Sequence, residues 1–443
     1  MSYSEAIQFL YGLNLFGANF GLETTRQLAA RVGNPQEKLR FVHVAGTNGK
    51  GSTCAMLESI YRAAGLRVGL FTSPHLVSFR ERIQVNRERI PENDVVRLVE
   101  DLRRTGVMPV SNQIPAQAEP EIRNERNPGP TFFEFVTVMA LKFFAEQRCD
   151  LVIWETGLGG RLDATNIVTP LASVITNIAF DHQQWLGETL DKIAFEKAGI
   201  IKSKIPVVTA VDEPEALAVI EKIARENNAP LVKMISEFGI RNSELSLLGE
   251  HQKQNAALTR TTIEVLQKII PVLEEQIRAG LQNVNWPGRL QLLEKPDGQK
   301  ILLDGAHNVA GANVLREAIE NSFSSEQRTF ILGMLQDKDW KRICEILAPL
   351  AEKIFTVPVS SGRTASPIDL AEVCRAANST AEIFICDSLK EAFEKTDACG
   401  HSSSHENFII VTGSLYLVGE ALELLGLSPT NKNERVLNEW AIK

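Results

Sequence analysis

The stretch with the clearest chemical potential is VAGTNGKGST, residues 44–53, which follows a short apolar run and precedes a segment with helical spacing. Glycines let backbone N–H groups approach a phosphate, and the start of a helix adds positive potential at the same point. We therefore expect Lys50 to bridge the β- and γ-phosphates of a nucleotide, and Ser52 or Thr53 to reach a magnesium ion. The alternative is a glycine-rich turn that only joins a strand to a helix.

The spacing of this stretch differs from that of the common phosphate-binding loop, G-x-x-x-x-G-K-[ST]. Val44 stands where the common loop has its first glycine, and Gly51 separates Lys50 from Ser52. The stretch therefore predicts a variant nucleotide loop, and the role of the extra glycine is open at this point.

Charged side chains that follow apolar runs form a second group of candidates. Glu155 ends DLVIW and precedes the polar, glycine-rich TGLGGRLDATN, while Asp181 and His182 follow LASVITNIAF. A carboxylate at the carboxyl end of a parallel strand lies where α/β proteins bind ligands. A lone histidine is more often structural, so the interest of His182 depends on carboxylates close to it.

Two further stretches contain candidate residues. In LLDGAHN, Asp304 and His307 either cap the helix expected near Asn308 or contact a nucleotide bound between two domains. In IAFEKAGIIK, the local pattern favours Lys197 as a helix-terminal lysine that complements the helix dipole before Gly199.

The elements that must position these residues are short apolar runs alternating with helical segments, as in βαβ units around a buried parallel sheet. The alternation restarts at about residue 299 with QKILLDGAHN. We predict an α/β protein of two domains: residues 1–286 form a P-loop-type ATPase domain with a mostly parallel sheet, and residues 287–443 form a smaller Rossmann-like domain. Trp-Pro-Gly-Arg at 286–289 is a candidate hinge, and the polar segment 109–130 is a candidate surface loop.

The composition excludes several functional classes. A net charge of −8 argues against a nucleic-acid binder, and six cysteines without a C-x-x-C pair favour reduced thiols over disulfides or a zinc site. The N-terminus does not look like a signal peptide, and no apolar run approaches the ~20 residues of a membrane span. We expect a cytoplasmic protein that acts as a monomer on small molecules.

A series of stretches, in this order along nearly the whole chain, resembles the Mur-ligase superfamily and, within it, the folylpolyglutamate synthase and dihydrofolate synthase family. The stretches are GTNGKGS, TSPHLVSFRERI, TFFEFVTVMAL, ETGLGGRLDATN, DHQQWLGETLDKIAFEKAGIIK, HQKQNA, WPGRLQ, DGAHN and TGSLYLVGE. The chain looks like bacterial bifunctional members. The resemblance implies ATP-dependent ligation of L-glutamate to dihydropteroate, to reduced folates or to both, through an acyl phosphate.

The resemblance also implies roles for individual residues. It places ATP against Gly46, Thr47, Asn48, Gly49, Lys50, Gly51, Ser52, Asn255, Arg289, Asp304 and His307. It implies that Ser73 and Glu155 hold one Mg²⁺, and that Glu155 and His182 serve a second. Lys197 matches a lysine that is carbamylated and then helps to hold the second metal, which reverses the local interpretation. Lys50, Glu155, His182 and Lys197 are thus the expected catalytic residues.

Three other features are specific to this chain or less defined. Arg82 falls in a segment that the family places beside the active site. Val309 departs from the frequent DGAHNP, which puts the entry of the following helix in question, and the 109–130 segment has no clear family counterpart.

Two competing functions remain to be weighed against this one. A ligase acting on a UDP-muramoyl precursor carries a separate domain ahead of the ATP loop, and the about 45 residues before Gly46 are too few for one. A nucleotide-gated binding protein without ligase activity would not require the whole catalytic set. The sequence leaves open which acceptor is used, the preferred folate form and tail length, and whether extension uses an α- or a γ-carboxyl.

Overall fold

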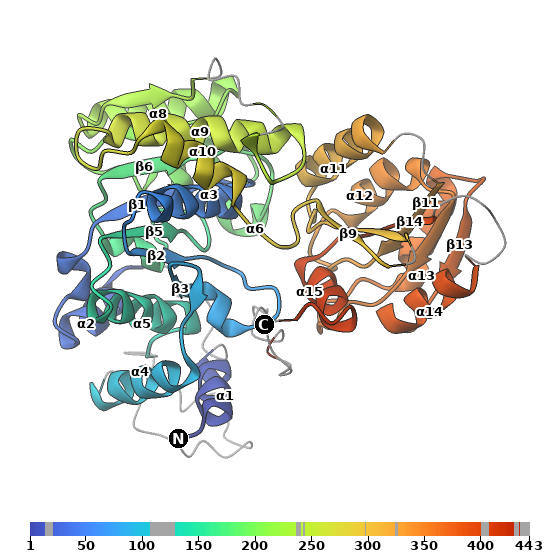
Figure 1. Ribbon diagram of the computed structural model, residues 1–443, viewed down its shortest axis with the longest axis horizontal. Coiled ribbons are helices and arrows are strands. Elements are labelled where there is room, and N and C mark those ends of the chain that lie inside the picture. Colours follow the sequence, from blue (N-terminus) through green and yellow to red (C-terminus); the bar gives the residue numbers. More distant parts are fainter. Residues whose placement is uncertain are drawn as a thin grey trace.

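The computed structural model describes residues 1–13, 21–106, 129–235, 241, 244–296, 298–323, 327–399, 407–428 and 434. These residues form two α/β domains, each built on its own sheet (Figure 1). The predicted two-domain α/β class with mostly parallel sheets is therefore confirmed. The 286/287 boundary stays a prediction, and most of the 109–130 segment lies outside the described residues.

The described part of the N-terminal domain contains an eight-stranded sheet in the order β4-β3-β2-β5-β1-β6-β7-β8. Its strands are β1 (Phe41–Ala45), β2 (Val68–Phe71), β3 (Ile83–Val85), β4 (Glu88–Arg89), β5 (Leu151–Glu155), β6 (Ala172–Ile175), β7 (Val207–Thr209) and β8 (Leu231–Lys233). Six of these strands pair in parallel, in the order β2-β5-β1-β6-β7-β8, and β3 and β4 extend the β2 edge in antiparallel fashion. All five residues of β1 and of β5 are buried, because helices cover both faces of the sheet.

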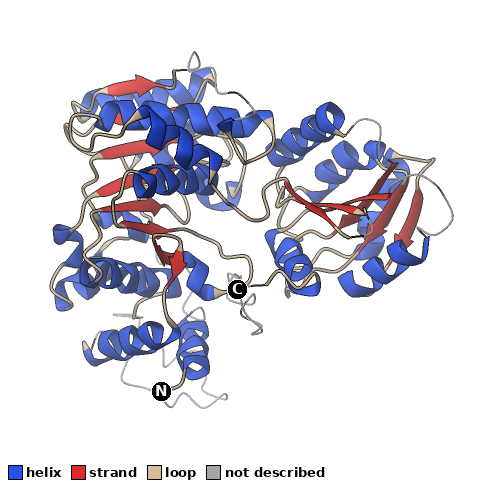
Figure 2. Cartoon of the chain, viewed as in Figure 1, coloured by secondary structure: helices blue, strands red, loops and turns tan. Residues whose placement is uncertain are grey.

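The helices of this domain form a layer on each face of the sheet (Figure 2). They are α1 (Tyr3–Leu13), α2 (Glu23–Arg31), α3 (Lys50–Ala63), α4 (Glu92–Arg104), α5 (Phe132–Glu146), α6 (Gln183–Leu186), α7 (Leu190–Ala198), α8 (Pro214–Glu226), α9 (Glu250–Leu266) and α10 (Glu274–Gln282), with short 3-10 turns η2 (Pro35–Lys38), η3 (Phe79–Arg82) and η5 (Ala164–Ile167). Alternate residues of β1 face the two layers. Phe41 belongs to the apolar cluster that includes residues of α1, α2, α4 and α5, whereas Val42 belongs to the cluster that includes residues of α3, α9 and α10.

The C-terminal domain repeats this arrangement on a smaller scale. Its described strands are β9 (Gln291–Glu294), β10 (Lys300–Leu303), β11 (Gln327–Leu332), β12 (Lys353–Thr356), β13 (Glu382–Ile385) and β14 (Asn407–Thr412), in the order β13-β12-β11-β14-β10-β9. Its helices are α11 (Val309–Ser322), α12 (Trp340–Leu347), α13 (Pro367–Ala377), α14 (Leu389–Cys399) and α15 (Leu415–Leu424), with one 3-10 turn, η8 (Ala348–Leu350). Only the edge strand β9 is antiparallel among these strands.

The two domains are joined after a pair of helices. The helices α9 and α10 lie on either side of Pro271, and the chain then runs through Trp286–Arg289 into β9. α10 packs so closely on α3 that a Cβ on Gly280 would lie 2.5 Å from Ile60 Cα. Across the residues that the structure describes, no helix has the length and apolar character needed to cross a membrane.

Candidate active site

A cavity of about 830 Å³ lies between the two domains, at the carboxyl ends of strands from both sheets. This is the edge at which open α/β sheets bind ligands, and the volume is in the range of small-molecule sites. The residues expected at the nucleotide and metal sites line it almost without exception, namely Thr47, Asn48, Gly49, Lys50, Gly51, Ser52, Ser73, Glu155, His182, Lys197, Asn255, Arg289, Asp304 and His307. Gly46 is not among the lining residues.

The loop between β1 and α3 presents an open helix N-terminus to the cavity. Gly49 adopts a left-handed conformation with φ of 81°, and α3 begins at Lys50 without a side-chain cap on its first N–H groups. The amides at the start of a helix have no partner within the helix. They can therefore bind a phosphate at this point.

The glycines of this loop are required by close neighbours. A Cβ on Gly46 would lie 1.8 Å from Thr176 Oγ1, and a Cβ on Gly51 would lie 2.9 Å from the indole ring of Trp286. Gly51, the residue that separates this loop from the common P-loop pattern, thus makes room for a tryptophan of the predicted hinge. The structure gives a physical reason for the unusual spacing.

Lys50 and Lys197 meet at one carbonyl oxygen. Lys50 Nζ donates to Gly46 O and to Thr47 O, at 3.0 Å each, and Lys197 Nζ donates to Gly46 O at 2.8 Å. Lys197 is only 4% exposed. Burial, with a contribution from the nearby Lys50 charge, lowers the pKa of Lys197 to about 7. Its amine is therefore readily available in the neutral form.

Glu155 is a buried carboxyl at the end of β5. Its Oε2 accepts the backbone N–H of Ser73 at 3.1 Å. Burial raises the pKa of Glu155 to about 7, although Lys50, the Ser73 N–H, Arg289 and Arg82 oppose the rise. A cation placed beside this group would favour its ionised form.

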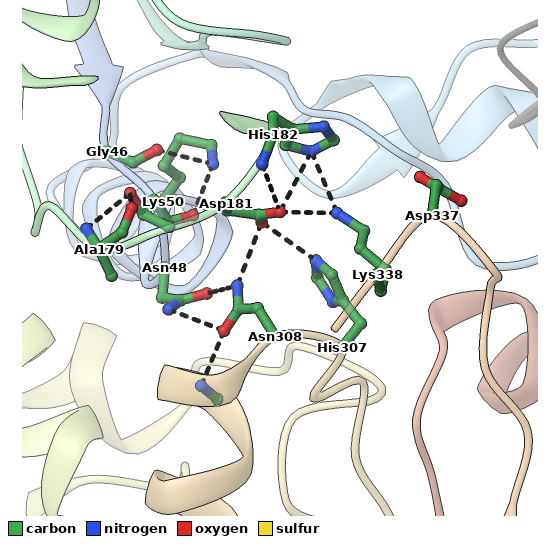
Figure 3. Close-up of polar contacts among 12 residues, drawn as sticks. Gly46, Asn48, Lys50, Ala179, Asp181, His182, His307, Asn308, Asp337 and Lys338 are labelled. Atoms are coloured by element: carbon green, nitrogen blue, oxygen red, sulfur yellow. Dashed lines mark hydrogen bonds and ion pairs between the residues drawn. The ribbon is translucent and has the colours of Figure 1, made fainter. Parts of the chain in front are cut away.

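Asp181 is the centre of a polar network that crosses between the domains (Figure 3). It accepts Lys338 Nζ at 2.7 Å and Asn308 Nδ2 at 3.1 Å, and His307 Nε2 lies 3.8 Å from it. Although burial opposes ionisation, nearby positive charge, including the Lys338 ammonium, holds the pKa of Asp181 below its usual range. The contact keeps the second domain against the first at the cavity.

His182 follows Asp181 in a left-handed conformation with φ of 51°. Burial lowers the pKa of His182 to about 3, so its imidazole is neutral and can present a lone pair to a metal. The sequence around Lys338 does not indicate a site residue, because LQDKDW has the composition of an ordinary exposed turn. Nothing local indicates that its ammonium reaches the other domain.

The C-terminal domain contributes Asp304, His307 and Arg289, but not as helix caps. Asp304 accepts the backbone N–H groups of Leu290 and Ala306, both at 2.9 Å, and His307 Nδ1 donates to Gly305 O at 2.8 Å. The residue that caps α11 is Asn308. The capping alternative for Asp304 and His307 is therefore wrong, because a neighbouring side chain already satisfies the helix end.

Two other expectations concern the surroundings of these residues. α11 starts at Val309, so the departure from DGAHNP does not disturb the helix entry. Arg289 donates a hydrogen bond from Nη1 to Gly288 O at 3.0 Å. Burial lowers the pKa of Arg289, and the charges of Asp304 and Glu155 oppose this decrease. These acids therefore lie where they stabilise the Arg289 charge.

The donor groups fit a magnesium ion that arrives with a nucleotide. Within the described ranges, no three or more His, Cys, Asp or Glu side chains are grouped closely enough to hold a metal. Mg²⁺ is usually bound through one or two carboxylates together with substrate phosphates and water. Glu155 and the hydroxyls of Ser52 and Ser73 supply oxygen donors along the cavity, whereas an unmodified Lys197 supplies none.

The lining of the cavity also includes aromatic side chains and a further cation. Phe132, Phe133 and Leu158 line the cavity, and the Arg82 guanidinium lies 5.3 Å from the Phe132 ring centroid. Arg82 is 4% exposed. Aromatic side chains beside a buried cation suit a flat aromatic molecule with a negative group.

Comparisons with known proteins agree with this arrangement. A family model described as "Dihydrofolate synthetase, C-terminal domain" matches residues 290–424. The dihydrofolate synthase/folylpolyglutamate synthase of Bacillus subtilis (strain 168) is 37% identical over 95% of this chain and 98% of its own. Among solved structures, folylpolyglutamate synthase from Thermotoga maritima has a TM-score of 0.81 at 33% identity, covering 98% of both chains. E. coli FolC in complex with DHPP and ADP has a TM-score of 0.82 at 30% identity, covering 96% of this chain and 98% of that one.

Proposed function

Because the chain belongs to the dihydrofolate synthase/folylpolyglutamate synthase family, we propose that it is an ATP-dependent ligase. It joins L-glutamate to an acceptor, which is dihydropteroate, a reduced folate or both, and it releases ADP and phosphate. The observation that carries this function is that one cavity combines an open helix N-terminus and Lys50 with Arg82 and aromatic side chains. The first pair suits the phosphates of a nucleotide, and the second suits an aromatic carboxylate.

In the first step, the acceptor carboxylate oxygen attacks the γ-phosphorus of ATP. The bond to the bridging oxygen breaks, ADP leaves and an acyl phosphate forms. Both reactants are anions, so positive charge must shield them as they approach. Lys50 exchanges the carbonyls of Gly46 and Thr47 for phosphate oxygens, while the N-terminus of α3 and Arg289 add positive potential.

In the second step, the amine nitrogen of glutamate attacks the acyl carbon. The carbon–oxygen bond to phosphate breaks, phosphate leaves, and the amine loses a proton as the amide forms. Water would hydrolyse the acyl phosphate, so the reaction benefits from a cavity closed by both domains. The Asp181–Lys338 ion pair holds the domains together at this point.

We assign the remaining nucleotide contacts to residues that surround the cavity. The loop residues Gly46 to Ser52 cradle the phosphates, and Asn255, Arg289, Asp304 and His307 lie around the rest of the nucleotide. Asn255 is close to the loop, since a Cβ on Gly49 would lie 2.5 Å from its side-chain oxygen. Asp304 acts mainly by holding Ala306 and Leu290, because its oxygens accept their N–H groups.

Two magnesium ions complete the proposed site. Ser73 and Glu155 would hold one, and Glu155, His182 and carbamylated Lys197 would serve the second. The ions would neutralise charge on the reacting phosphates. Glu155 is fixed for this role by the Ser73 N–H, and the buried Lys197 amine is neutral often enough to attack CO₂. The nitrogen–carbon bond forms as the amine loses a proton, which gives a carbamate.

The decisive experiment measures phosphate release with dihydropteroate and with tetrahydrofolate side by side, each with and without glutamate. Release that requires an acceptor and glutamate together supports a ligase, and the preferred acceptor distinguishes the two activities. Nucleotide binding without coupled release would support the binding-protein alternative instead. Ligation of an amino acid to a UDP-muramoyl precursor alone would support the other alternative.

Cytoplasmic location and a monomeric state stay part of the proposal. Sedimentation at micromolar concentration tests the second directly, since a dimer would double the mass expected from the 49.0 kDa chain.

A further inference from the structure

Arg82 is a buried cation that needs a defined orientation. Its guanidinium lines the cavity beside Ser73 and Glu155 and lies against the Phe132 ring. Its Nε donates to His75 Nδ1 at 2.8 Å. A flexible arginine at this position would direct its charge less consistently toward an anionic acceptor, so the group that holds Nε matters for binding.

His75 can hold Arg82 in only one tautomer. Because Nδ1 accepts from Arg82, the ring proton must be on Nε2, which donates to Glu434 O at 3.1 Å. His75 is 2% exposed, and burial lowers its pKa well below the usual value, which keeps the ring neutral. The backbone carbonyl of Glu434 therefore selects the tautomer that can accept from Arg82.

Glu434 is fixed in place by several donors. Its Oε2 accepts Tyr3 Oη at 3.0 Å, Ser78 Oγ at 2.9 Å and the Phe79 N–H at 2.8 Å. Tyr11 Oη also donates to the Glu434 carbonyl at 3.2 Å. Glu434 is 3% exposed although it follows α15 of the other domain in sequence. A buried carboxylate with three donors on one oxygen is a built contact rather than a surface encounter.

Glu434 contacts the segment of residues 73–82, which is held together by its own hydrogen bonds. Ser73 at one end donates its N–H to Glu155, and η3 at the other end carries Arg82. Between them, the Glu81 carboxylate accepts the N–H groups of Leu76, Val77 and Ser78. Displacement of this segment would therefore alter the position of Arg82.

We propose that Glu434 is a positioning residue for the acceptor side of the active site, and that it acts through His75 on Arg82. The carboxylate anchors the residue to α1 and η3, and the carbonyl fixes His75. Part of the C-terminal domain's chain thereby controls the orientation of a cation in the N-terminal domain. The inference rests on the proposed function insofar as the anion that Arg82 meets is the acceptor.

The test is calorimetric titration of the full chain with dihydropteroate and with ADP, followed by steady-state kinetics. Glu434→Ala should weaken dihydropteroate binding about tenfold, which corresponds to roughly 1.4 kcal/mol, and leave ADP binding unchanged. Glu215→Ala, an exposed glutamate in the first turn of α8, is the matched control. Tyr3→Phe, which removes one donor to Glu434, should give a smaller change in the same direction.

A second variant isolates the relay through His75. His75→Asn places an amide oxygen near the position of Nδ1, where it can accept from Arg82 without help from Glu434. In the His75→Asn background, Glu434→Ala should cause much less further loss of dihydropteroate affinity. If the losses from the two substitutions add in full, Glu434 does not act through His75. Unchanged dihydropteroate binding in folded Glu434→Ala, or an equal loss for ADP, overturns the proposal. If the unaltered protein binds dihydropteroate but releases no phosphate, the ligase function fails and the binding comparison still tests Glu434.

Discussion

Each domain has a glycine-containing loop that joins a strand to a helix at the cavity, and the two helix ends differ. In the N-terminal domain, α3 starts after Gly49 without a side-chain cap. In the C-terminal domain, Asn308 caps α11 by accepting the Gly311 N–H at 2.8 Å. One helix N-terminus is open to an anion, and the other is already satisfied from its own chain.

The difference shows that a strand, a glycine and a helix do not by themselves make a phosphate site. A phosphate can bind only where the first N–H groups of the helix are not already bonded to a capping side chain. Asn308 uses its remaining capacity across the interface, donating to Asn48 at 3.0 Å and to Asp181 at 3.1 Å. We therefore expect the ATP phosphates at α3, while the loop before α11 closes the site over them.

The largest effect should come from Lys50→Ala, which removes the cation from the open helix end. Turnover should fall by about 10²–10³-fold, or ~3–4 kcal/mol of barrier, because charge developing on the phosphates loses its partner. Lys222→Ala, on the exposed surface of α8, is the control. Initial rates of phosphate release measure the loss of turnover, and denaturant unfolding checks that the variant remains folded. A Lys50→Ala enzyme with a near-normal rate would show that the loop is not the ATP site.

The next largest effect is expected for Lys197, which donates a hydrogen bond to Gly46 O of the same loop. Lys197→Ala should lose roughly 10²-fold in rate, about 2.7 kcal/mol of barrier, and a small added carboxylate should restore part of it by replacing the carbamate oxygens. Lys197→Arg should stay inactive, because a guanidinium keeps its charge and cannot form this carbamate. ¹³C NMR of the intact protein in ¹³CO₂-bicarbonate detects the modification directly.

Carbamate formation should also respond to pH. The pKa of Lys197 lies near 7, so the neutral amine increases as the pH rises through that value. At a fixed concentration of dissolved CO₂, the carbamate signal should increase over the same interval. A plainly unmodified Lys197 in a catalytically competent metal complex would contradict the assignment.

Some of the fold and site follow from local pattern, and some do not. β1 and β5 are continuous apolar runs because both their faces are buried, so their positions and the acid at the end of β5 were predictable. The short, partly polar strands β4 and β9 carry no such signal. Lys338 contacts Asp181 across 157 positions of sequence, and Glu434 reaches η3 from beyond α15. Such contacts depend on domain packing, which a local pattern does not encode.

The next prediction concerns the pH dependence of stability and the two buried acids beside these loops, Asp304 and Glu155. Burial raises the pKa of both acids. Asp304 accepts two backbone N–H groups, whereas the carboxyl of Glu155 accepts the N–H of Ser73 and its pKa rises from 4.5 to about 7. The folded state thus binds the Glu155 proton more tightly than the unfolded state does. This contribution to stability is present below pH 4.5 and is lost as the pH rises to about 7.

Glu155→Gln removes this titration. Relative to the variant, the unaltered protein should lose up to about 3 kcal/mol of unfolding free energy between pH 4.5 and pH 7. Urea unfolding of both proteins across this interval measures the difference. Addition of Mg²⁺ and ADP should reduce it, because a bound cation favours the ionised carboxylate. Parallel stability curves would mean that Glu155 ionises normally.

A smaller effect is expected for Gly51, the glycine that distinguishes the loop before α3. Gly51→Ala should press a methyl group on Trp286, cost about 1–3 kcal/mol, and weaken ATP binding about tenfold. Replacing Trp286 with alanine in the same chain should restore part of the loss by removing the clash. Gly12→Ala, where no heavy atom lies within 4 Å, is the control. If Trp286→Ala gives no relief, the indole is not the reason for the glycine.

The smallest effect should come from opening the capped helix. Asn308→Ala removes the acceptor for the Gly311 N–H and should lower the free energy of unfolding by about 1 kcal/mol. Asn308→Ser can cap α11 again but is too short to repeat the contacts with Asn48 and Asp181. Stability should therefore recover in the serine variant, whereas any loss of domain closure should persist in both. Small-angle scattering with ADP and acceptor measures closure, and denaturant unfolding measures the cap. If the serine variant recovers neither property, Asn308 does not act as two separable contacts; if alanine changes neither, the end of α11 is not stabilised by this side chain.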